Sequence, residues 1–197
     1  MHPALPQPLP LFPLQAVLLP GGPLALQIFE VRYLEMIRNC HRDNTPFGVV
    51  CLSAGTEVRR AGAPAESFHD VGTLATISQL ETLQPALLRV QCTGTQRFRA
   101  DNPRQQPNGL WVADATLLPD DPPTPIPADL QDCATQLAAL LRRHGIGEDL
   151  QLDDCGWVAN RWCEVLPLPH TVKQRLMALD NPLLRLELVN DILDQNA

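Results

Sequence analysis

Lysine and serine are scarce in this chain of 197 residues, and their scarcity argues against two classes of enzyme. The single lysine is Lys173, and the three serines are Ser53, Ser67 and Ser78. Lys173 follows a valine, so no phosphate-binding loop of the form G-x-x-x-x-G-K-[ST] is present. No serine lies in a G-x-S-x-G turn, the setting of many hydrolase nucleophiles. The sequence therefore argues against ATP hydrolysis and against serine-based hydrolysis.

Long hydrophobic runs are also missing. No apolar stretch approaches the ~20 residues that a membrane-spanning helix needs. The start, Met1 to Ala4, lacks the basic residues and the apolar stretch of a signal peptide. The hydrophobic content of 45% is ordinary for a globular protein. We expect a cytoplasmic protein without a membrane partner.

The chain has little positive charge for its size, with a formal net charge of -7. A negative protein is repelled by the phosphates of nucleic acids, so the charge argues against a nucleic acid partner. The basic pairs Arg59-Arg60 and Arg142-Arg143 are short, which is typical of solvated surface.

Metal-ligand spacing is absent among the six cysteines, since no C-x-x-C pair occurs. Cys155 and Cys163 are the nearest pair, but eight residues on one helix place them ~12 Å apart, beyond the ~7 Å limit of a disulfide. We expect reduced thiols, no metal and no cofactor.

Two apolar runs, Leu14 to Leu19 and Leu24 to Phe29, open the chain, with a Pro-Gly-Gly-Pro cluster at 20–23 between them. This cluster predicts a turn, so the two runs are predicted to pair as strands. A helical period follows, with Tyr33 and Ile37 on one side.

Further apolar runs predict the rest of an antiparallel sheet. Strands are predicted at Phe47 to Leu52, Val71 to Leu80, Ala86 to Phe98 and Leu110 to Leu118, and a long loop at Ser53 to His69.

Prolines dominate residues 119–127, and such a segment forms neither a helix nor the interior of a sheet. We therefore predict three parts: a β-rich domain at 1–118, a proline-rich linker at 119–127 and a helical domain at 128–197.

Four helices are predicted after the linker, at Leu130 to His144, Asp154 to Leu166, Thr171 to Leu179 and from Pro182 onward. Asp153 is expected to cap the second helix and Thr171 the third. Leu184, Leu188 and Ile192 are expected to form the inward face of the last helix.

Several short motifs occur in a fixed order along the chain. They are Leu9-Pro10-Leu11, Val17-Leu18-Leu19-Pro20, Phe29-Glu30-Val31-Arg32-Tyr33, Gly72-Thr73, Gly94-Thr95-Gln96-Arg97-Phe98, Leu166-Pro167, Lys173-Gln174 and Arg185-Leu186. This order resembles the N-terminal, substrate-recognition domain of ATP-dependent Lon proteases. The resemblance covers Leu9 to about Leu193, and a stand-alone bacterial member of that family is our expectation.

The resemblance implies an α+β fold, in which a PUA-like β-rich pseudo-barrel with one inserted helix precedes an α-helical bundle. It also implies a non-catalytic protein- or peptide-binding module, an adaptor or chaperone-like binder of exposed hydrophobic segments. The implied partners are unfolded or partly folded proteins or peptides, with a protease as a further candidate. RNA binding is the alternative, because PUA-like folds also serve that purpose. Self-association is left open.

No catalytic residue is expected. Cys40 and His41 are neighbours on a predicted helix, where adjacent side chains point ~100° apart, and His69-Asp70 has no nucleophile beside it in the sequence.

The family-signature residues Phe29, Glu30, Arg32 and Tyr33 are interpreted as structural, through capping and ion pairing at the start of a helix. Trp157 lies off the apolar stripe of its predicted helix. It either docks against the β-rich domain, which we favour, or binds a partner protein.

Overall fold

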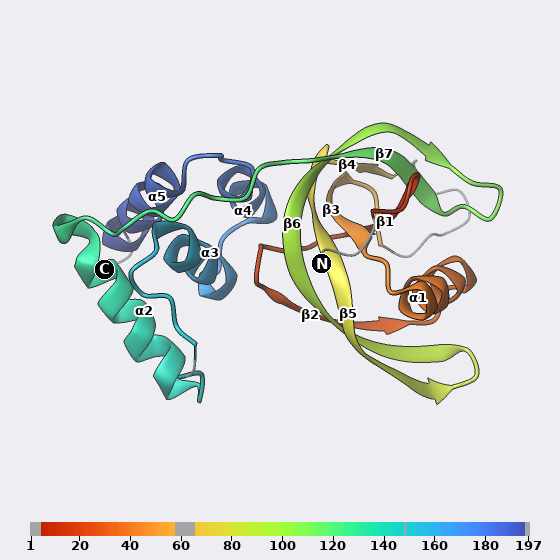
Figure 1. The fold of residues 1–197 in the computed structure, drawn as a ribbon, viewed down its shortest axis with the longest axis horizontal. Helices are drawn as coiled ribbons and strands as arrows, with labels where there is room; N and C mark the ends of the chain where they lie inside the picture. The colour runs from red at the N-terminus through yellow and green to blue at the C-terminus, as the bar shows by residue number, and fades with distance from the viewer. Residues whose placement is uncertain (1–4, 58–65, 148, 196–197) are drawn as a thin grey trace. The chain divides into compact units, whose positions relative to one another are not determined.

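The computed structural model divides the chain into two compact units, residues 1–119 and residues 120–197 (Figure 1). It describes residues 5–57, 66–147 and 149–195. The basic pair at 59–60 and residues 58–65 of the predicted loop at 53–69 lie outside the described residues. The described ends of that loop contain strand residues at 53–54 and 67–68, so the loop prediction is wrong there. The predicted division into domains at 1–118, 119–127 and 128–197 stays a prediction.

Among its described residues, the first unit contains a seven-stranded sheet and one helix. Its elements are β1 (Leu9–Leu14), β2 (Pro23–Ile28), α1 (Val31–Asp43), β3 (Phe47–Ala54), β4 (Ser67–Phe68), β5 (Val71–Gln84), β6 (Leu87–Gln105) and β7 (Trp111–Leu117). The strand order is β1-β7-β6-β5-β3-β4, and β1 also pairs with β3. Because β1 has both β7 and β3 as neighbours, five strands close into a ring, which is a pseudo-barrel. The predicted α+β fold is confirmed.

The predicted pairing of residues 14–19 with residues 24–29 is wrong. The first strand is β1, which ends at Leu14 and pairs in parallel with β3 and antiparallel with β7. The second, β2, pairs antiparallel with β6, from Pro23 opposite Thr93 to Ile28 opposite Leu88. The residues between β1 and β2 therefore connect two separate strands of the sheet and form no hairpin.

The physical reason lies in the contacts of the Pro-Gly-Gly-Pro turn with β6. The amide of Gly21 donates to the carbonyl of Gly94, and the amide of Gly94 donates to the carbonyl of Gly22, both at 2.8 Å. A Cβ atom at Gly94 would lie 2.3 Å from the carbonyl oxygen of Leu19, so only glycine permits this approach. The cluster is a turn, as predicted, but its backbone is bound to a distant strand.

The predicted helix after residue 29 is α1, and its buried side includes Tyr33 and Ile37, as predicted. It packs into an apolar core with β1, β2, β3, β5 and β6. The buried members of this core are Phe12, Leu14, Leu18, Ile28, Tyr33, Leu34, Met36, Ile37, Cys40, Phe47, Val49, Ala75, Leu88, Val90, Cys92 and Leu110.

Strands β5 and β6 extend beyond their predicted ends at Leu80 and Phe98. Their added residues are mostly exposed and polar, and Arg89 forms an ion pair of 2.9 Å with Glu81 across the hairpin. Cross-strand pairs stabilise this extension, and they leave no apolar alternation for a sequence pattern to detect.

The second unit is helical. Its elements are the 3₁₀ turn η1 (Ala128–Leu130), α2 (Gln131–Arg143), α3 (Cys155–Val165), α4 (His170–Met177) and α5 (Pro182–Gln195). Two predicted caps are wrong by one or two positions. Asp154, not Asp153, caps α3 by accepting from the amide of Trp157 at 2.8 Å. Thr171 lies within α4, which begins after Pro169.

The predicted inward face of α5 is also wrong. Leu184 and Leu188 are 40% and 38% exposed, whereas Arg185, Leu186 and Val189 are buried. The guanidinium of Arg185 binds Asp121, Asn160 and the carbonyl of Leu176 inside the unit. Apolar periodicity counts arginine as a surface residue. The pattern therefore predicted the face with Leu184 and Leu188 as the buried one.

The proline-rich residues 120–127 pack within the second unit. The amide of Ile126 donates to the carbonyl of Asp153 at 3.2 Å, and the amide of Cys155 donates to the carbonyl of Thr124 at 2.8 Å. The segment thus holds the start of α3. Across the described helices of both units, none is long and apolar enough to cross a membrane.

Candidate functional site

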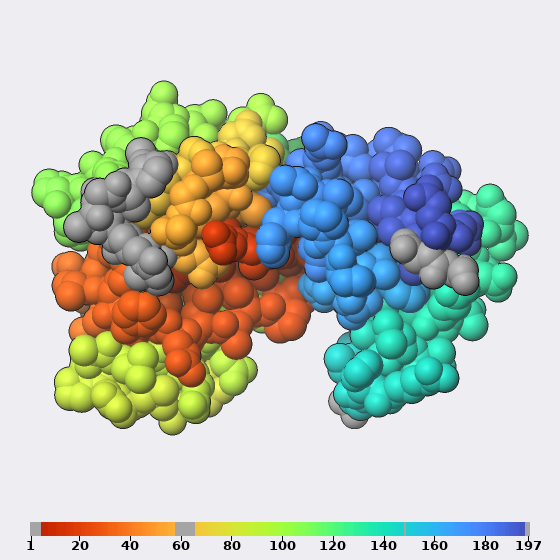
Figure 2. Space-filling model, turned by 180° about the vertical axis from the view of Figure 1, so that it is seen from behind, coloured from red at the N-terminus to blue at the C-terminus, as the bar shows by residue number. Residues whose placement is uncertain are grey.

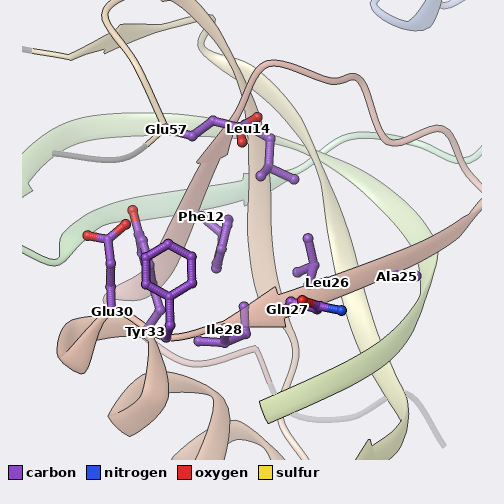
Figure 3. Close-up of a pocket in the computed structure, with 10 residues that line it drawn as sticks. Phe12, Leu14, Ala25, Leu26, Gln27, Ile28, Glu30, Tyr33 and Glu57 are labelled. Carbon is purple, nitrogen blue, oxygen red and sulfur yellow. The ribbon is translucent and has the colours of Figure 1, made fainter. Parts of the chain in front are cut away.

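A pocket of about 190 Å³ lies in the first unit, beside β1, β2 and the start of α1 (Figure 3). Figure 3 shows the side chains of Phe12 and Leu14 from β1 and of Leu26 and Ile28 from β2 reaching toward the same space. Ten residues line the pocket: Phe12, Leu14, Ala25, Leu26, Gln27, Ile28, Phe29, Glu30, Tyr33 and Glu57.

The pocket lies where β2 and the last residues of β1 each have one edge that pairs with no other described strand. β1 pairs with β7 only from Leu9 to Leu11, while its last residues pair with β3 alone. Within the described part of the chain, β2 pairs only with β6. Apolar side chains from β1 and β2 therefore line a gap that no strand fills.

One wall of the pocket is aromatic and neutral. The rings of Phe12 and Tyr33 stack with their centroids 4.2 Å apart. Burial raises the pKa of the Tyr33 hydroxyl well above its ordinary value, although the guanidinium of Arg32 acts in the opposite direction. The hydroxyl therefore stays protonated at physiological pH, and this wall carries no charge.

Two carboxylates, Glu30 and Glu57, lie at the pocket. Glu30 forms an ion pair of 3.1 Å with Nε of Arg32, whose side chain is more deeply buried than that of Glu30. Glu57 accepts a hydrogen bond from the backbone amide of Gln15. Since the compensating guanidinium is buried, the accessible charge at the pocket is negative.

Arg32 also links the start of α1 to distant parts of the first unit. It donates to the carbonyl of Gly109 at 2.9 Å and lies 3.4 Å from the carboxylate of Glu66. Glu66 in turn accepts from the indole of Trp111 at 2.8 Å. Of the two predicted interactions, the ion pair is present, whereas Glu30, at the N-cap of α1, forms no capping hydrogen bond with its side chain. A structural role for Glu30, Arg32 and Tyr33 stays a prediction.

Phe29 differs from the other signature residues. Its side chain is 55% exposed and lines the pocket. A structural role for Phe29 stays a prediction. The strand pattern contains a signal for the exposure of Phe29, because Ile28 already faces the core, and the next side chain must then point outward. Figure 2 shows the orange-red part of the chain, which includes β2 and the start of α1, at the surface of the first unit.

Trp157, unlike Phe29, is no part of the pocket. It is half-buried on α3, and the guanidinium carbon of Arg161 lies 5.9 Å from its ring centroid. Trp157 belongs to the second unit and does not line the pocket. Its role as a protein-binding residue stays a prediction.

The thiols offer no reactive group. All six cysteines are buried, and burial raises the pKa of each thiol above its ordinary value. A reactive cysteine needs a lowered pKa and access to solvent. Among the residues that the structure describes, no group of three or more His, Cys, Asp or Glu side chains is placed to hold a metal ion.

Two curated relatives are cereblon proteins from vertebrates. Cereblon from Danio rerio is 30% identical over 146 residues, and cereblon from Gallus gallus is 30% identical over 139 residues. Each match includes 70% of this chain. This chain spans only 30% and 29% of the length of those relatives.

Two solved structures share the fold over most of their length. A Lon N-terminal domain protein from Xanthomonas campestris is 32% identical, with a TM-score of 0.72 over 93% of this chain and 96% of that one. The N-terminal domain of a Mycobacterium avium complex Lon protease is 14% identical, with a TM-score of 0.63 and the same coverage. The sequence model of one protein family, the ATP-dependent protease La (LON) substrate-binding domain, matches residues 8–195. The chain therefore belongs to the family of LON substrate-binding domains, a non-catalytic module.

Proposed function

We propose that this chain is a protein-binding module that captures exposed hydrophobic segments of unfolded or partly folded proteins and acts as an adaptor or chaperone-like binder in the cytoplasm. The observation that carries the proposal is the pocket to which β1 and β2 contribute apolar side chains and which the exposed Phe29 also lines, in a member of a substrate-binding family. Apolar surface of this kind gains free energy when it is covered by another apolar group.

Binding without catalysis fits the residues present. The chain carries no phosphate-binding loop in its sequence, and its thiols are buried with raised pKa values. We propose that any cutting of the captured protein is done by a separate protease. The family description, ATP-dependent protease La, makes such a protease the second partner to test.

Charge favours a protein partner over RNA. The accessible groups at the pocket are the carboxylates Glu30 and Glu57, and the net charge of the chain is -7. RNA recognition uses basic surfaces with exposed aromatic groups that stack on bases. A gel-shift titration at low salt should therefore show no RNA complex.

The test is a titration with a permanently unfolded protein. Reduced, carboxymethylated α-lactalbumin carrying a fluorescent label should raise its anisotropy in a saturable way, with a dissociation constant of roughly 10–100 μM, because ordering a flexible chain offsets much of the gain from burial. Native α-lactalbumin, which has the same sequence with its apolar side chains buried, should not bind. Equal behaviour of the two forms would contradict the proposal.

A further inference from the structure

Among the described residues, no strand pairs with the outer edge of β2. Its sequence, Pro-Leu-Ala-Leu-Gln-Ile, contains no charged residue, and its proline occupies the first position. Its register with β6 runs without a shift from Pro23 to Ile28. Proteins usually protect a free edge with charge, an internal proline or a bulge. The residues of β2 itself provide none of these protections.

An open edge of this kind can accept another strand. Alternate amide and carbonyl groups of an edge strand point away from the sheet, and an extended peptide can pair with them. Leu24 and Leu26 pack against the core from β2, whereas Ala25 and Gln27 are exposed and small or uncharged. The exposed side chains therefore leave room for a chain lying alongside.

The pocket lies next to this edge and has a suitable size for one side chain. A dry, apolar cavity of ~150 Å³ holds a benzene molecule. The pocket measures about 190 Å³ and is lined by Phe12, Leu14, Leu26 and Ile28. It can thus receive one leucine or phenylalanine side chain from a peptide on the edge.

The acidic groups define what should flank that side chain. Glu30 and Glu57 both line the pocket, from the start of α1 and from the segment after β3. In an extended peptide, residues two positions apart lie on the same face. A basic residue two positions from the apolar anchor would face the same surface as these carboxylates.

From these observations we infer that the captured segment adds to the sheet as an extended strand along the open edge of β2. It places one large apolar side chain in the pocket and basic side chains near Glu30 and Glu57. The inference rests on the proposed function and specifies the conformation and the chemistry of the partner.

A labelled peptide, Thr-Arg-Val-Leu-Val-Arg-Thr, tests the inference in its parts. Replacing both arginines by glutamate should weaken binding about tenfold through repulsion, and replacing leucine by serine should weaken it to a similar extent. Methylating the backbone nitrogens of both valines removes strand-pairing donors at an almost unchanged composition. If the peptide pairs with β2 through these donors, the methylated peptide should bind at least about fivefold more weakly.

Protein variants locate the site. Phe29→Ala should weaken binding of the unmodified peptide about fivefold, because it removes apolar surface at the pocket. Val31→Ala is the matched control, since Val31 is 79% exposed, lies two residues away and does not line the pocket. Glu57→Gln should weaken binding, whereas Glu35→Gln, an exposed residue of α1 outside the pocket, should leave it within about twofold.

The outcomes separate the two proposals. If carboxymethylated α-lactalbumin binds but the Phe29→Ala and Glu57→Gln variants bind as the unaltered chain does, the edge site is wrong while the proposed function stands. Equal binding of the methylated and unmethylated peptides would overturn strand addition in the same way. If the unfolded protein itself fails to bind, the proposed function is wrong.

Discussion

At the scale of the residue, the buried guanidinium of Arg32 connects three separate segments of the first unit. It joins Glu30 and Glu66, two carboxylates from separate segments, and the carbonyl of Gly109. Removing one member of a buried ion pair leaves the other charge uncompensated in a poorly solvated place. Exposed pairs lack this penalty because water replaces the lost partner.

Arg32→Ala should lower the free energy of unfolding by about 3–5 kcal/mol. Arg42→Ala is the control, because Arg42 pairs with Asp43 at the surface, and its loss should leave the unfolding midpoint almost unchanged. Urea unfolding followed by circular dichroism measures both. Similar midpoints for the two variants would contradict the assigned role of Arg32.

At the scale of the element, local sequence patterns predict single helices and strands better than they predict which strands pair with each other. The helix α1 follows from a helical period because one of its sides is buried. The strand β3 follows from a short apolar run because both of its faces are buried over its first residues. The partner of β2 is β6, and the paired residues, from Pro23 opposite Thr93 to Ile28 opposite Leu88, are far apart in the sequence. The contact of Gly94 with the turn before β2 is therefore not local either. The pocket lies between two strand edges, so it depends on the same long-range pairing and no sequence pattern predicts it.

The orientation of α5 gives a direct test at this scale. Leu186→Ala should lower the free energy of unfolding by about 2–5 kcal/mol, because Leu186 is fully buried. Leu188→Ala, one of the residues first expected to face inward, should cost less than about 1 kcal/mol since its side chain is 38% exposed. Chemical denaturation of both variants decides between the two faces, and a larger loss at Leu188 would show that the helix faces the other way.

At the scale of the whole molecule, the buried thiols couple folding to alkaline pH. Burial raises the pKa of Cys92 to about 12 and those of Cys133 and Cys163 to about 11, from an ordinary value of 9.0. Above pH 9 the unfolded chain loses these protons while the folded chain keeps them. The folded state then binds more protons, so its stability decreases as pH rises.

The free energy of unfolding should therefore be insensitive to these thiols below about pH 8 and should fall between about pH 9 and 11. Cys92→Ala provides the control, because the variant loses the contribution of that thiol and should show a shallower decline over the same range. Denaturation midpoints at a series of pH values measure the slope. Identical slopes with and without Cys92 would show that its pKa is not raised by the fold.

Both units enter the account of function, but only the first carries the proposed binding site. Its accessible Phe29 and acidic groups lie beside an open strand edge, while Trp157 in the second unit remains a separate candidate. We therefore propose a place as well as an activity: captured protein chains contact the β2 edge.

Hydrogen exchange of the whole chain, measured with and without carboxymethylated α-lactalbumin, tests that claim most directly. We expect slower exchange at residues 23–33 when the unfolded protein is present, because β2 amides on the outer edge gain partners. Native α-lactalbumin should leave exchange unchanged. Saturable binding with unaltered exchange at residues 23–33 would contradict the claim.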